Sequence, residues 1–308
     1  MPVRVGTSFG RFNFEGIGAF RAWLDLCEDS HIDSIWQSDT VISKQMFHEP
    51  LSLLAVIAGA TRRLKIGMNA VVLGFRDPVT FARQCASIDH LSEGRLLPVI
   101  GVGGGDLDAW EATGRTPARR GARANEALEV LTRLWSEEDV SFEGEFLKVA
   151  NATISPRPVQ QPFPLWIGGS SKAAIRRTVR YGSGWLGGLQ DVDSAIATAA
   201  DIRSEAKVQG KTIPQDHYGA SVLFRIQSDA ELRSGRGSNE KTRTGVEKLM
   251  VSGSAELVLD TLRKYVKGGI SKFVLVPMVR NQADLIEQTR LLNQEVIPEA
   301  AKIEMPVF

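Results

Sequence analysis

The sequence is poor in the residues that build disulfides and metal sites. It contains two cysteines, Cys27 and Cys85, both in amphipathic segments, and four scattered histidines. Two cysteines without a CxxC pattern exclude a disulfide framework and a cysteine zinc site, and the histidines show neither HExxH nor HxH spacing. We therefore predict two buried free thiols and no metal site.

The chain also lacks a surplus of charge and any long apolar run. Its 37 basic and 36 acidic residues give a net charge of +1, so no basic surface for nucleic acid is expected. No apolar stretch reaches the ~18 residues of a membrane span. The first residues, MPVRVGTSFG, show no signal-peptide pattern. The sequence thus predicts a cytoplasmic protein with no nucleic-acid or membrane partner.

What the sequence does contain is an alternation of short apolar strands with helical patterns. Apolar residues recur at helical spacing in several segments, and Ser254 and the pair Gly268-Gly269 are start and stop signals of one further helix. Helices are expected over 77–92, 118–136 and 281–303, and strands over 3–9, 33–38, 64–71, 95–102, 164–169, 182–188, 218–227 and 272–278.

Eight apolar strands that alternate with helices indicate parallel strands covered by helices. An open doubly wound sheet and a closed eight-fold barrel both fit this pattern. The count of eight favours an α/β fold of the (βα)8 TIM-barrel type, as a single domain over 1–308 with insertions at its C-terminal mouth. One insertion, 140–162, predicts a small hairpin and a proline-rich connector. The other, 228–253, is polar and is either a mobile surface loop or a lid.

A glycine-rich stretch, GVGGGD at 101–106, follows the fourth expected strand. A dinucleotide-binding fingerprint needs Gly or Ala at its sixth position and a helix directly after it. Asp106 occupies that position and the next clear helical pattern begins near 118, so both tests disfavour a fingerprint. In a barrel this stretch lies on the catalytic rim, where Gly103 and Gly104 leave the backbone open to a ligand. A plain glycine turn is the alternative.

A second glycine-rich stretch, WIGGSSKAAIRRT at 166–178, leads from a strand into a helix. Ser170 or Ser171 is expected to cap that helix. The free N–H groups at a helix start favour an anion, and barrels commonly hold a phosphate in their later loops. We predict that Gly168, Gly169 and Ser170 hold the phosphate of a long cofactor lying across the mouth. An ordinary cap without a ligand is the alternative.

Three longer stretches occur in an order typical of one enzyme family. They are SIWQSDT, KIGMNAVVLGFRDPVTFARQCASIDHLSEGRLLPVIGVGGGD and VSFEGEFLKVANATISPRPVQQPFPLWIGGSSKAAIRRTVRYGSGW. With them, residues 3–280 resemble the bacterial-luciferase-like superfamily of flavin- and deazaflavin-dependent oxidoreductases. The GVGGGD loop is similar to that of the F420-dependent methylene-tetrahydromethanopterin reductases.

The resemblance implies a flavin or deazaflavin ring at the C-terminal mouth of the barrel. It also implies a non-prolyl cis peptide at the end of strand three, behind the ring, which in this sequence would join Asn69 to Ala70. Asp39 matches a strand-two Asp of the F420-dependent members. We therefore treat Asp39 as a cofactor-binding and catalytic candidate that hydrogen-bonds near the ring or substrate. A helix cap or turn residue is its alternative.

The chain departs from the sugar-phosphate and alcohol dehydrogenases of the family at two proton-handling positions. Those enzymes carry His beside the strand-two Asp and Glu in the strand-four loop, where this chain has Thr40 and Gly104. Loss of a positioned base typically costs ~10²–10⁴ in rate, which disfavours alcohol oxidation by that mechanism.

Four residues are candidates for the substrate pocket. Thr40 follows the strand-two Asp, and Phe9 ends the first strand as either a pocket wall or a barrel plug. Trp185 is either a wall of the site or a core residue. Arg243 either grips an acidic group or belongs to a solvated basic loop.

These observations and the resemblance predict hydride transfer between reduced coenzyme F420 and a small, largely apolar substrate, such as an activated alkene, an imine or a quinone. The first alternative is an FMN-dependent monooxygenase that receives reduced flavin from a partner reductase. The second is a non-catalytic flavin-binding protein. A flavin or F420 reductase is the expected protein partner, and the resemblance implies a homodimer.

Overall fold

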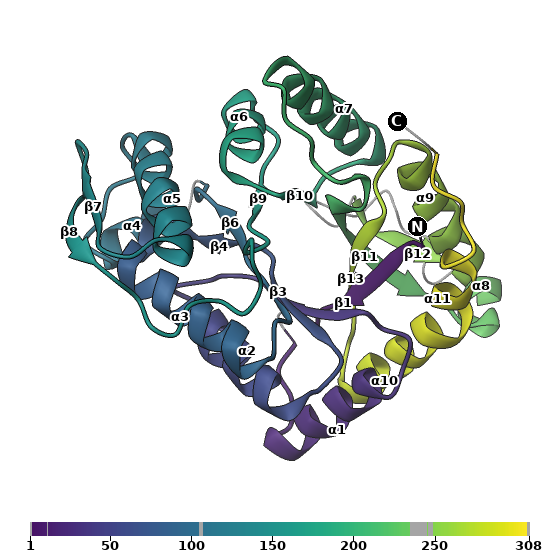
Figure 1. Ribbon diagram of the computed structural model, residues 1–308. Helices are drawn as coiled ribbons and strands as arrows, with labels where there is room; N and C mark the ends of the chain where they lie inside the picture. Colours follow the sequence, from purple (N-terminus) through teal and green to yellow (C-terminus); the bar gives the residue numbers. More distant parts are fainter. Residues whose placement is uncertain (1, 11, 105–106, 235–244, 246–248, 307–308) are drawn as a thin grey trace.

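The computed structural model describes residues 2–10, 12–104, 107–234, 245 and 249–306. Helices surround a curled central sheet, and the two chain termini lie on the same side of the molecule (Figure 1). The strands of the sheet are β1 (Arg4–Thr7), β2 (Ser34–Gln37), β3 (Lys65–Met68), β4 (Val71–Val72), β5 (Leu96–Leu97), β6 (Val99–Gly101), β9 (Trp166–Gly168), β10 (Gly184–Leu189), β11 (Tyr218–Ile226), β12 (Val251–Gly253) and β13 (Lys272–Pro277). The helices are α1 (Ile17–Glu28), α2 (Pro50–Ala60), α3 (Pro78–Leu91), α4 (Leu107–Ala112), α5 (Arg120–Ser136), α6 (Lys172–Tyr181), α7 (Val192–Val208), α8 (Asp229–Ser234), α9 (Ala255–Lys267), α10 (Gln282–Leu291) and α11 (Ile297–Ala300), with 3₁₀ turns η1 (Leu73–Phe75) and η2 (Gln215–His217) and a π-helical turn η5 (Leu292–Val296).

The strand pairs of the central sheet are all parallel over the described residues. The strand order is β4-β6-β9-β10-β11-β13-β1-β2-β3-β5, and β12 pairs with β11. The path ends in β4 and β5. β4 closely follows β3 in the chain, and β6 closely follows β5, so the two ends of the path belong to two successive stretches of chain. The predicted α/β fold, a parallel sheet covered by helices, is therefore confirmed.

Local signals explain where most elements begin and end. Nearly every residue of β11 is buried, as expected of a parallel strand covered on both faces. Helix α9 begins where Ser254 accepts a hydrogen bond from the Leu257 N–H, and it ends at Gly268, as predicted. The prediction that the next helix after the glycine stretch starts near 118 was wrong, because α4 begins at Leu107. Six residues are too few to show a helical period.

The predicted hairpin between residues 140 and 162 is present. Strands β7 (Val140–Glu143) and β8 (Lys148–Ala152) pair antiparallel. Glu126 of α5 accepts hydrogen bonds from the backbone N–H groups of Glu145, Phe146 and Leu147 at 2.9, 2.8 and 3.0 Å. These bonds fix the hairpin tip to α5.

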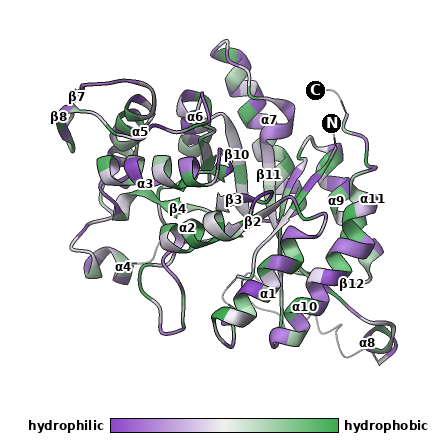
Figure 2. Ribbon diagram, turned by 60° about the horizontal axis from the view of Figure 1, so that its bottom comes forward, coloured by the Kyte–Doolittle hydropathy of each residue, from purple (hydrophilic) through white to green (hydrophobic). Residues whose placement is uncertain are grey.

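Hydrophobic residues fill the centre, and the outer helices carry hydrophilic residues as well (Figure 2). Cys27 and Cys85 are free and buried, as predicted, and burial raises the pKa of both thiols. Within the described parts of the chain, no helix combines the length and the apolar character that crossing a bilayer requires.

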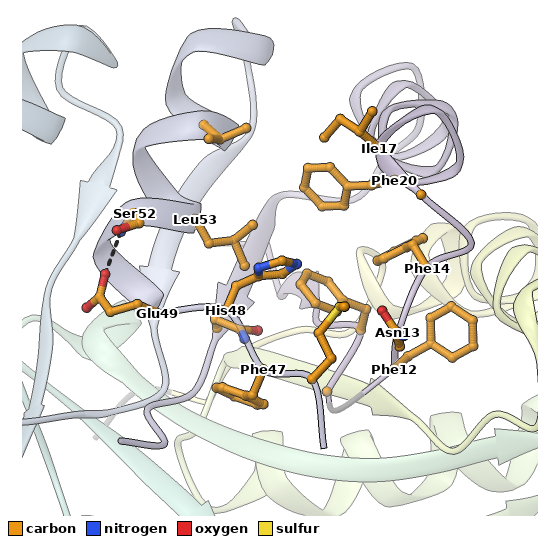
Figure 3. Close-up of a pocket in the computed structure, with 16 residues that line it drawn as sticks. Phe12, Asn13, Phe14, Ile17, Phe20, Phe47, His48, Glu49, Ser52 and Leu53 are labelled. Carbon is orange, nitrogen blue, oxygen red and sulfur yellow. Dashed lines mark hydrogen bonds between the residues drawn. The ribbon is translucent and has the colours of Figure 1, made fainter. Parts of the chain in front are cut away.

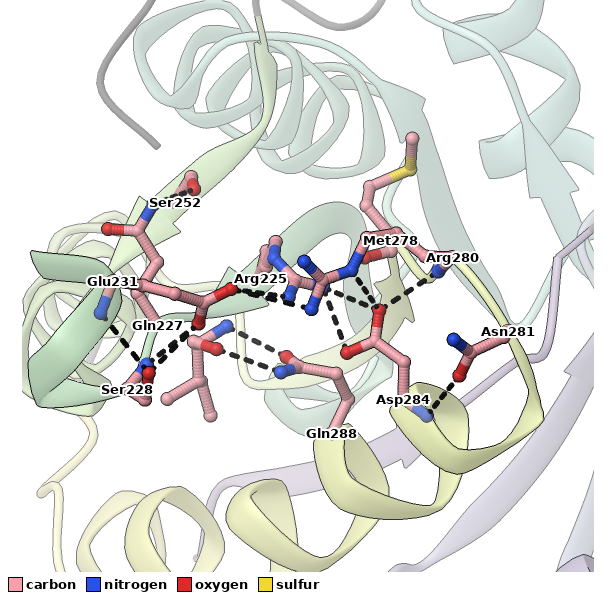
Figure 4. Close-up of polar contacts among 11 residues, drawn as sticks. Arg225, Gln227, Ser228, Glu231, Ser252, Met278, Arg280, Asn281, Asp284 and Gln288 are labelled. Atoms are coloured by element: carbon pink, nitrogen blue, oxygen red, sulfur yellow. Dashed lines mark hydrogen bonds and ion pairs between the residues drawn. The ribbon is translucent and has the colours of Figure 1, made fainter. Parts of the chain in front are cut away.

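A polar network joins β11 to α10 beside the predicted insertion (Figure 4). Arg225 donates to both carboxylate oxygens of Asp284, at 3.1 and 2.8 Å, and to Glu231 at 3.1 Å. Gln288 exchanges two hydrogen bonds of 2.8 Å with the backbone of Ile226. The start of the 228–253 segment is therefore held by α10.

The end of the same segment is held by the sheet. β12 pairs with β11, and the Gln227 N–H donates to the Gly253 carbonyl at 2.8 Å. Arg243 lies outside the described residues, so its predicted role stays a prediction.

Candidate functional site

The predicted cis peptide bond joins Asn69 to Ala70, in the interval between β3 and β4. The Asn69 N–H donates to the Gln37 carbonyl at 2.8 Å, and the Asn69 Oδ1 accepts from the Ser221 hydroxyl at 3.1 Å. Asn69 is thus held by β2 on one side and by β11 on the other.

Backbone without side chains surrounds Ala70. A Cβ added to Gly101 would lie 3.7 Å from the Ala70 Cβ, and one added to Gly168 would lie 3.5 Å from it. Gly101 ends β6 and Gly168 ends β9, so the ends of three neighbouring stretches meet at Ala70. We call Ala70, Gly101, Gly103, Gly168 and Gly169 the glycine rim. The carboxyl ends of parallel barrel strands are where catalytic sites form.

Gly103 and Gly104 differ in the space available for a side chain. Gly103 has φ +78°, and an added Cβ would lie 2.8 Å from Val72 Cγ1 and 3.1 Å from the Trp110 ring. The fold itself therefore requires glycine at position 103. An added Cβ at Gly104 meets nothing within 4 Å, so this position is open toward solvent.

The second glycine stretch forms the start of α6. Ser171 is the N-cap, and its hydroxyl accepts from the Ala174 N–H at 3.2 Å, which resolves the choice between Ser170 and Ser171. Gly169 has φ +101°, and both Gly169 and Ser170 are exposed. Exposed N–H groups at the start of a ten-residue helix favour an anion at this place.

Trp185 contacts the glycine rim from the buried side. Its indole N–H donates to the Gly169 carbonyl at 2.8 Å, and its side chain is fully buried. A role of Trp185 as a wall of the substrate pocket stays a prediction. The alternative interpretation, a core tryptophan, describes its position.

Asp39 makes its contacts with the protein itself. Its Oδ2 accepts from the Val72 N–H at 2.9 Å and from Arg76 Nη1 at 2.5 Å, and its Oδ1 accepts from Arg76 Nη2 at 3.0 Å. The side chain is 2% exposed. Asp39 thus fixes β4, directly after the cis peptide bond. Contact of Asp39 with a ring or substrate stays a prediction.

A cavity of about 410 Å³ opens between the segment after β1 and the segment before and within α2. Figure 3 shows Phe12, Phe14 and Phe20 on one side of this cavity, facing Phe47 and His48 on the other. We call this space the phenylalanine cavity. Phe9 lines it, whereas Thr40 and Trp185 are not among its lining residues, and the role of all three in a substrate pocket stays a prediction.

Sequence reasoning missed most of the cavity wall. Phe9, Gly10 and residues 12–14, together with residues 46–48, supply much of it, from segments without regular structure. The density of phenylalanine in FGRFNF was the available signal, but loops have no periodicity that would show where such side chains point.

Gln37 connects the phenylalanine cavity with the cis peptide bond. It lines the cavity, and its backbone carbonyl accepts the Asn69 N–H. Its side chain is almost fully buried, and Oε1 has no hydrogen-bond partner in the described residues. The cavity and the glycine rim are therefore neighbouring parts of one site.

Glu49 is the carboxylate of the cavity wall. Burial opposes its ionisation, but hydrogen bonds from Ser52 and Arg76 outweigh burial and hold the pKa of Glu49 below its ordinary value. Glu49 is therefore ionised at neutral pH. Among the residues that the structure describes, no group of three His, Cys, Asp or Glu side chains could hold a metal ion.

Comparison with known proteins assigns the chain to a family. The model of the luciferase-like monooxygenase family matches residues 4–234. The chain belongs to this family. The F420-dependent glucose-6-phosphate dehydrogenase of Kineococcus radiotolerans is 31% identical over 239 residues, which cover 74% of this chain and 69% of that protein. The FMNH(2)-dependent dimethylsulfone monooxygenase of Pseudomonas putida is 29% identical over 267 residues, which cover 81% and 72%.

The family's fold extends over the whole chain. The crystal structure of monooxygenase RslO1 from Streptomyces bottropensis superposes with a TM-score of 0.80 at 21% identity, covering 97% of this chain and 100% of that one. The chain also matches two mycobacterial proteins of unassigned function, at 31% and 33% identity, over 51% and 60% of their own length. The relatives thus include both F420- and FMN-dependent enzymes of the luciferase-like family.

Proposed function

We propose that this luciferase-like protein is an oxidoreductase that binds coenzyme F420 at the glycine rim. The observation that carries the proposal is the side-chain-free backbone at Gly101 and Gly168, which lies beside Ala70 and next to an apolar cavity. Flat rings need open backbone on one face and a substrate space on the other. The residues at the rim fit such a ring.

The proposed cofactor contacts follow from these positions. Asn69 and Ala70 back the ring, and Gly103 and Gly104 give it access to the backbone. Gly168, Gly169 and Ser170 hold the phosphate, supported by the positive end of α6. Asp39 positions the strand behind the ring through its hydrogen bonds with Val72 and Arg76. The proposed catalytic role of Asp39 acts through this strand.

Bound F420 would supply a hydride, and the chain's own residues would place and shield the substrate. The phenylalanine cavity suits a small, largely apolar substrate such as an activated alkene, an imine or a quinone. Thr40 replaces the base of the dehydrogenase members, so the chain offers an alcohol no proton acceptor there. His48, on the cavity wall, is a candidate proton donor to the reduced product.

We interpret the curled sheet as a (βα)8 barrel in which β3 with β4 and β5 with β6 are single strands, each interrupted once. The pairs β3–β5 and β4–β6 support this interpretation, because they join the same two stretches of chain. The barrel is then one domain over 1–308, with insertions at 140–162 and 228–253. The family resemblance also supports a homodimer.

An FMN-dependent monooxygenase supplied by a reductase is the second candidate. The dimethylsulfone monooxygenase relative supports it, because it matches a larger share of this chain than the F420-dependent relative does. Gly104 favours F420 instead, since some monooxygenase relatives place a basic residue in this loop for the flavin phosphate.

Titration of the purified protein with F420 and FMN, each oxidised and reduced, tests the proposal. We expect F420 to bind with a micromolar or lower Kd. The Kd of FMN should be at least ten times higher, which corresponds to a binding free energy weaker by about 1.4 kcal/mol or more. Turnover without oxygen supports hydride transfer. Oxygen consumption that matches turnover would establish the monooxygenase, and binding of neither cofactor would refute both.

A further inference from the structure

A second cavity, of about 300 Å³, lies between η1, the start of α5 and the tip of the β7–β8 hairpin. These elements form one corner of the molecule, away from α1 and α10 (Figure 1). We call this space the arginine cavity, because Arg76, Arg115, Arg120 and Arg123 line it and no acidic residue does so among the described residues.

Three of these arginines keep their charge without a carboxylate partner in the described part of the chain. Arg115 Nη1 donates to the backbone carbonyls of Gly74 and Arg76, at 3.0 and 3.3 Å, and Arg120 Nε donates to the Gly103 carbonyl at 3.1 Å. The Arg123 guanidinium lies 4.6 Å from the centre of the Phe146 ring. These contacts orient the guanidinium groups and leave most of their N–H donors free.

Four acidic groups of the neighbouring elements have other partners. Glu126 accepts three backbone N–H groups of the hairpin tip, and Glu145 pairs with Arg119. Asp39 and Glu49 pair with the fourth arginine, Arg76. These four carboxylates of the described residues therefore do not neutralise Arg115, Arg120 or Arg123.

Two further features lie at the cavity, the start of α5 and the Trp110 side chain. Arg119, the N-cap of α5, has φ +54°, and no side chain caps this seventeen-residue helix. The positive end of the helix dipole therefore adds to the arginine charge. Trp110 also lines the cavity; its side chain is 2% exposed, and its indole N–H has no acceptor in the described residues. Several cations at one place, without a carboxylate partner in the described residues, favour an acceptor that carries negative charge.

The floor of the cavity is apolar. It is formed by side chains that include Leu73, Pro78, Ala127 and Leu147, together with the Trp110 ring. An inorganic anion would leave this floor uncovered. We propose that the arginine cavity binds a small organic oxyanion, a carboxylate or phosphate on an apolar body, at a second site that borders the glycine rim at Gly103.

Calorimetric titration of the cofactor-free protein tests this proposal independently of the proposed function. The probes are 1-naphthoate and inorganic phosphate. We expect one naphthoate per chain and clearly weaker binding of phosphate, because phosphate lacks the apolar body. The double variant Arg115→Gln with Arg123→Gln should weaken naphthoate binding by about tenfold to a hundredfold. Arg290→Gln, an exposed charge on α10, is the matched control and should change nothing.

Several outcomes would overturn the proposal. They are no saturable naphthoate binding, equal binding by the double variant and the natural chain, or phosphate binding as tight as naphthoate. One-for-one displacement of naphthoate by F420 or FMN would instead assign the cavity to the cofactor's anionic tail, against a second site. If the glutamine variant fails to fold, the charge-retaining pair Arg115→Lys with Arg123→Lys should keep most of the binding, and its loss would count against the proposal.

Discussion

At the scale of single residues, Asp39 shows how a residue can match a site motif and still act through the backbone. Both of its oxygens accept hydrogen bonds from the protein, from Arg76 and from the Val72 N–H. Its side chain is 2% exposed and that of Arg76 is 13% exposed, so little water shares in this ion pair. The sequence indicates that Asp39 lies at the rim, but it cannot show which groups its oxygens contact.

Asp39→Asn should therefore lower stability as well as activity. We expect a loss of about 1–3 kcal/mol in the free energy of unfolding, since Arg76 loses a charge-assisted partner but keeps Glu49. Urea unfolding measures this loss. Glu49→Gln, whose side chain is 50% exposed, is the control and should cost less than about 1 kcal/mol. Unchanged stability together with lost turnover would show direct catalysis by Asp39 instead.

Gly103 and Gly104 form a matched pair for testing the rim. Gly103→Ala places a side chain at positive φ and within 2.8 Å of Val72, so we expect a loss of at least about 1–2 kcal/mol in stability. Gly104→Ala meets nothing within 4 Å and should leave stability nearly unchanged. Thermal unfolding compares the two variants. Equal stabilities would contradict the assignment of Gly103 to the fold.

At the scale of elements, local sequence patterns predicted most strands and helices, whereas contacts between distant segments could not be predicted. The strands are short apolar runs and Ser254 and Gly268 punctuate α9, so the residues themselves carry the information. Helix α4 escaped prediction because it has only six residues. The phenylalanine cavity escaped because the segments 10–16 and 46–49 have no regular period, and their side chains meet only in the folded chain.

The β11–α10 network predicts a defined response to acid. Burial opposes ionisation of Asp284, but hydrogen bonds from Arg225 and Arg280 outweigh burial and lower its pKa. A carboxyl group whose pKa is lower in the folded state stabilises the fold above its unfolded pKa of about 3.9. This contribution of Asp284 to stability is lost as the pH falls from the unfolded-state pKa through the lower folded-state pKa.

Asp284→Asn should therefore be less stable than the natural chain at neutral pH, and the difference should shrink below about pH 4. Urea unfolding at a series of pH values measures this difference. Asp201→Asn, at an exposed position on α7, should show no such convergence. A difference that is constant across the pH range would mean that Asp284 acts through packing and not through its charge.

At the scale of the whole molecule, the alternation of strands and helices was enough to predict a parallel sheet covered by helices, because each element covers its neighbour in chain order. The same regularity says nothing about chemistry, since family members on this fold use either F420 or FMN. In the proposed function, the side chains that would select the substrate of this chain lie on the segments after β1 and β2.

A cofactor that binds only the folded chain must stabilise it. At a concentration of about 100 times its Kd, F420 should add about 2.7 kcal/mol to the free energy of unfolding, measured by urea denaturation with and without cofactor. Gly168→Val, which adds methyl groups beside Ala70, should lose this gain while the cofactor-free variant remains folded. An undiminished gain in Gly168→Val would place the cofactor elsewhere.

The phenylalanine cavity and the glycine rim are built by different parts of the chain. Most of the cavity wall comes from residues 9–20 and 46–56, whereas the rim is main chain at the ends of later strands. Directed evolution could exploit this division. A mutant library confined to the two wall segments would search for new substrate preferences without altering a single rim position. With the proposed function, selectivity in this scaffold would be open to rapid change by natural or laboratory selection, while the cofactor-binding main chain stays the same.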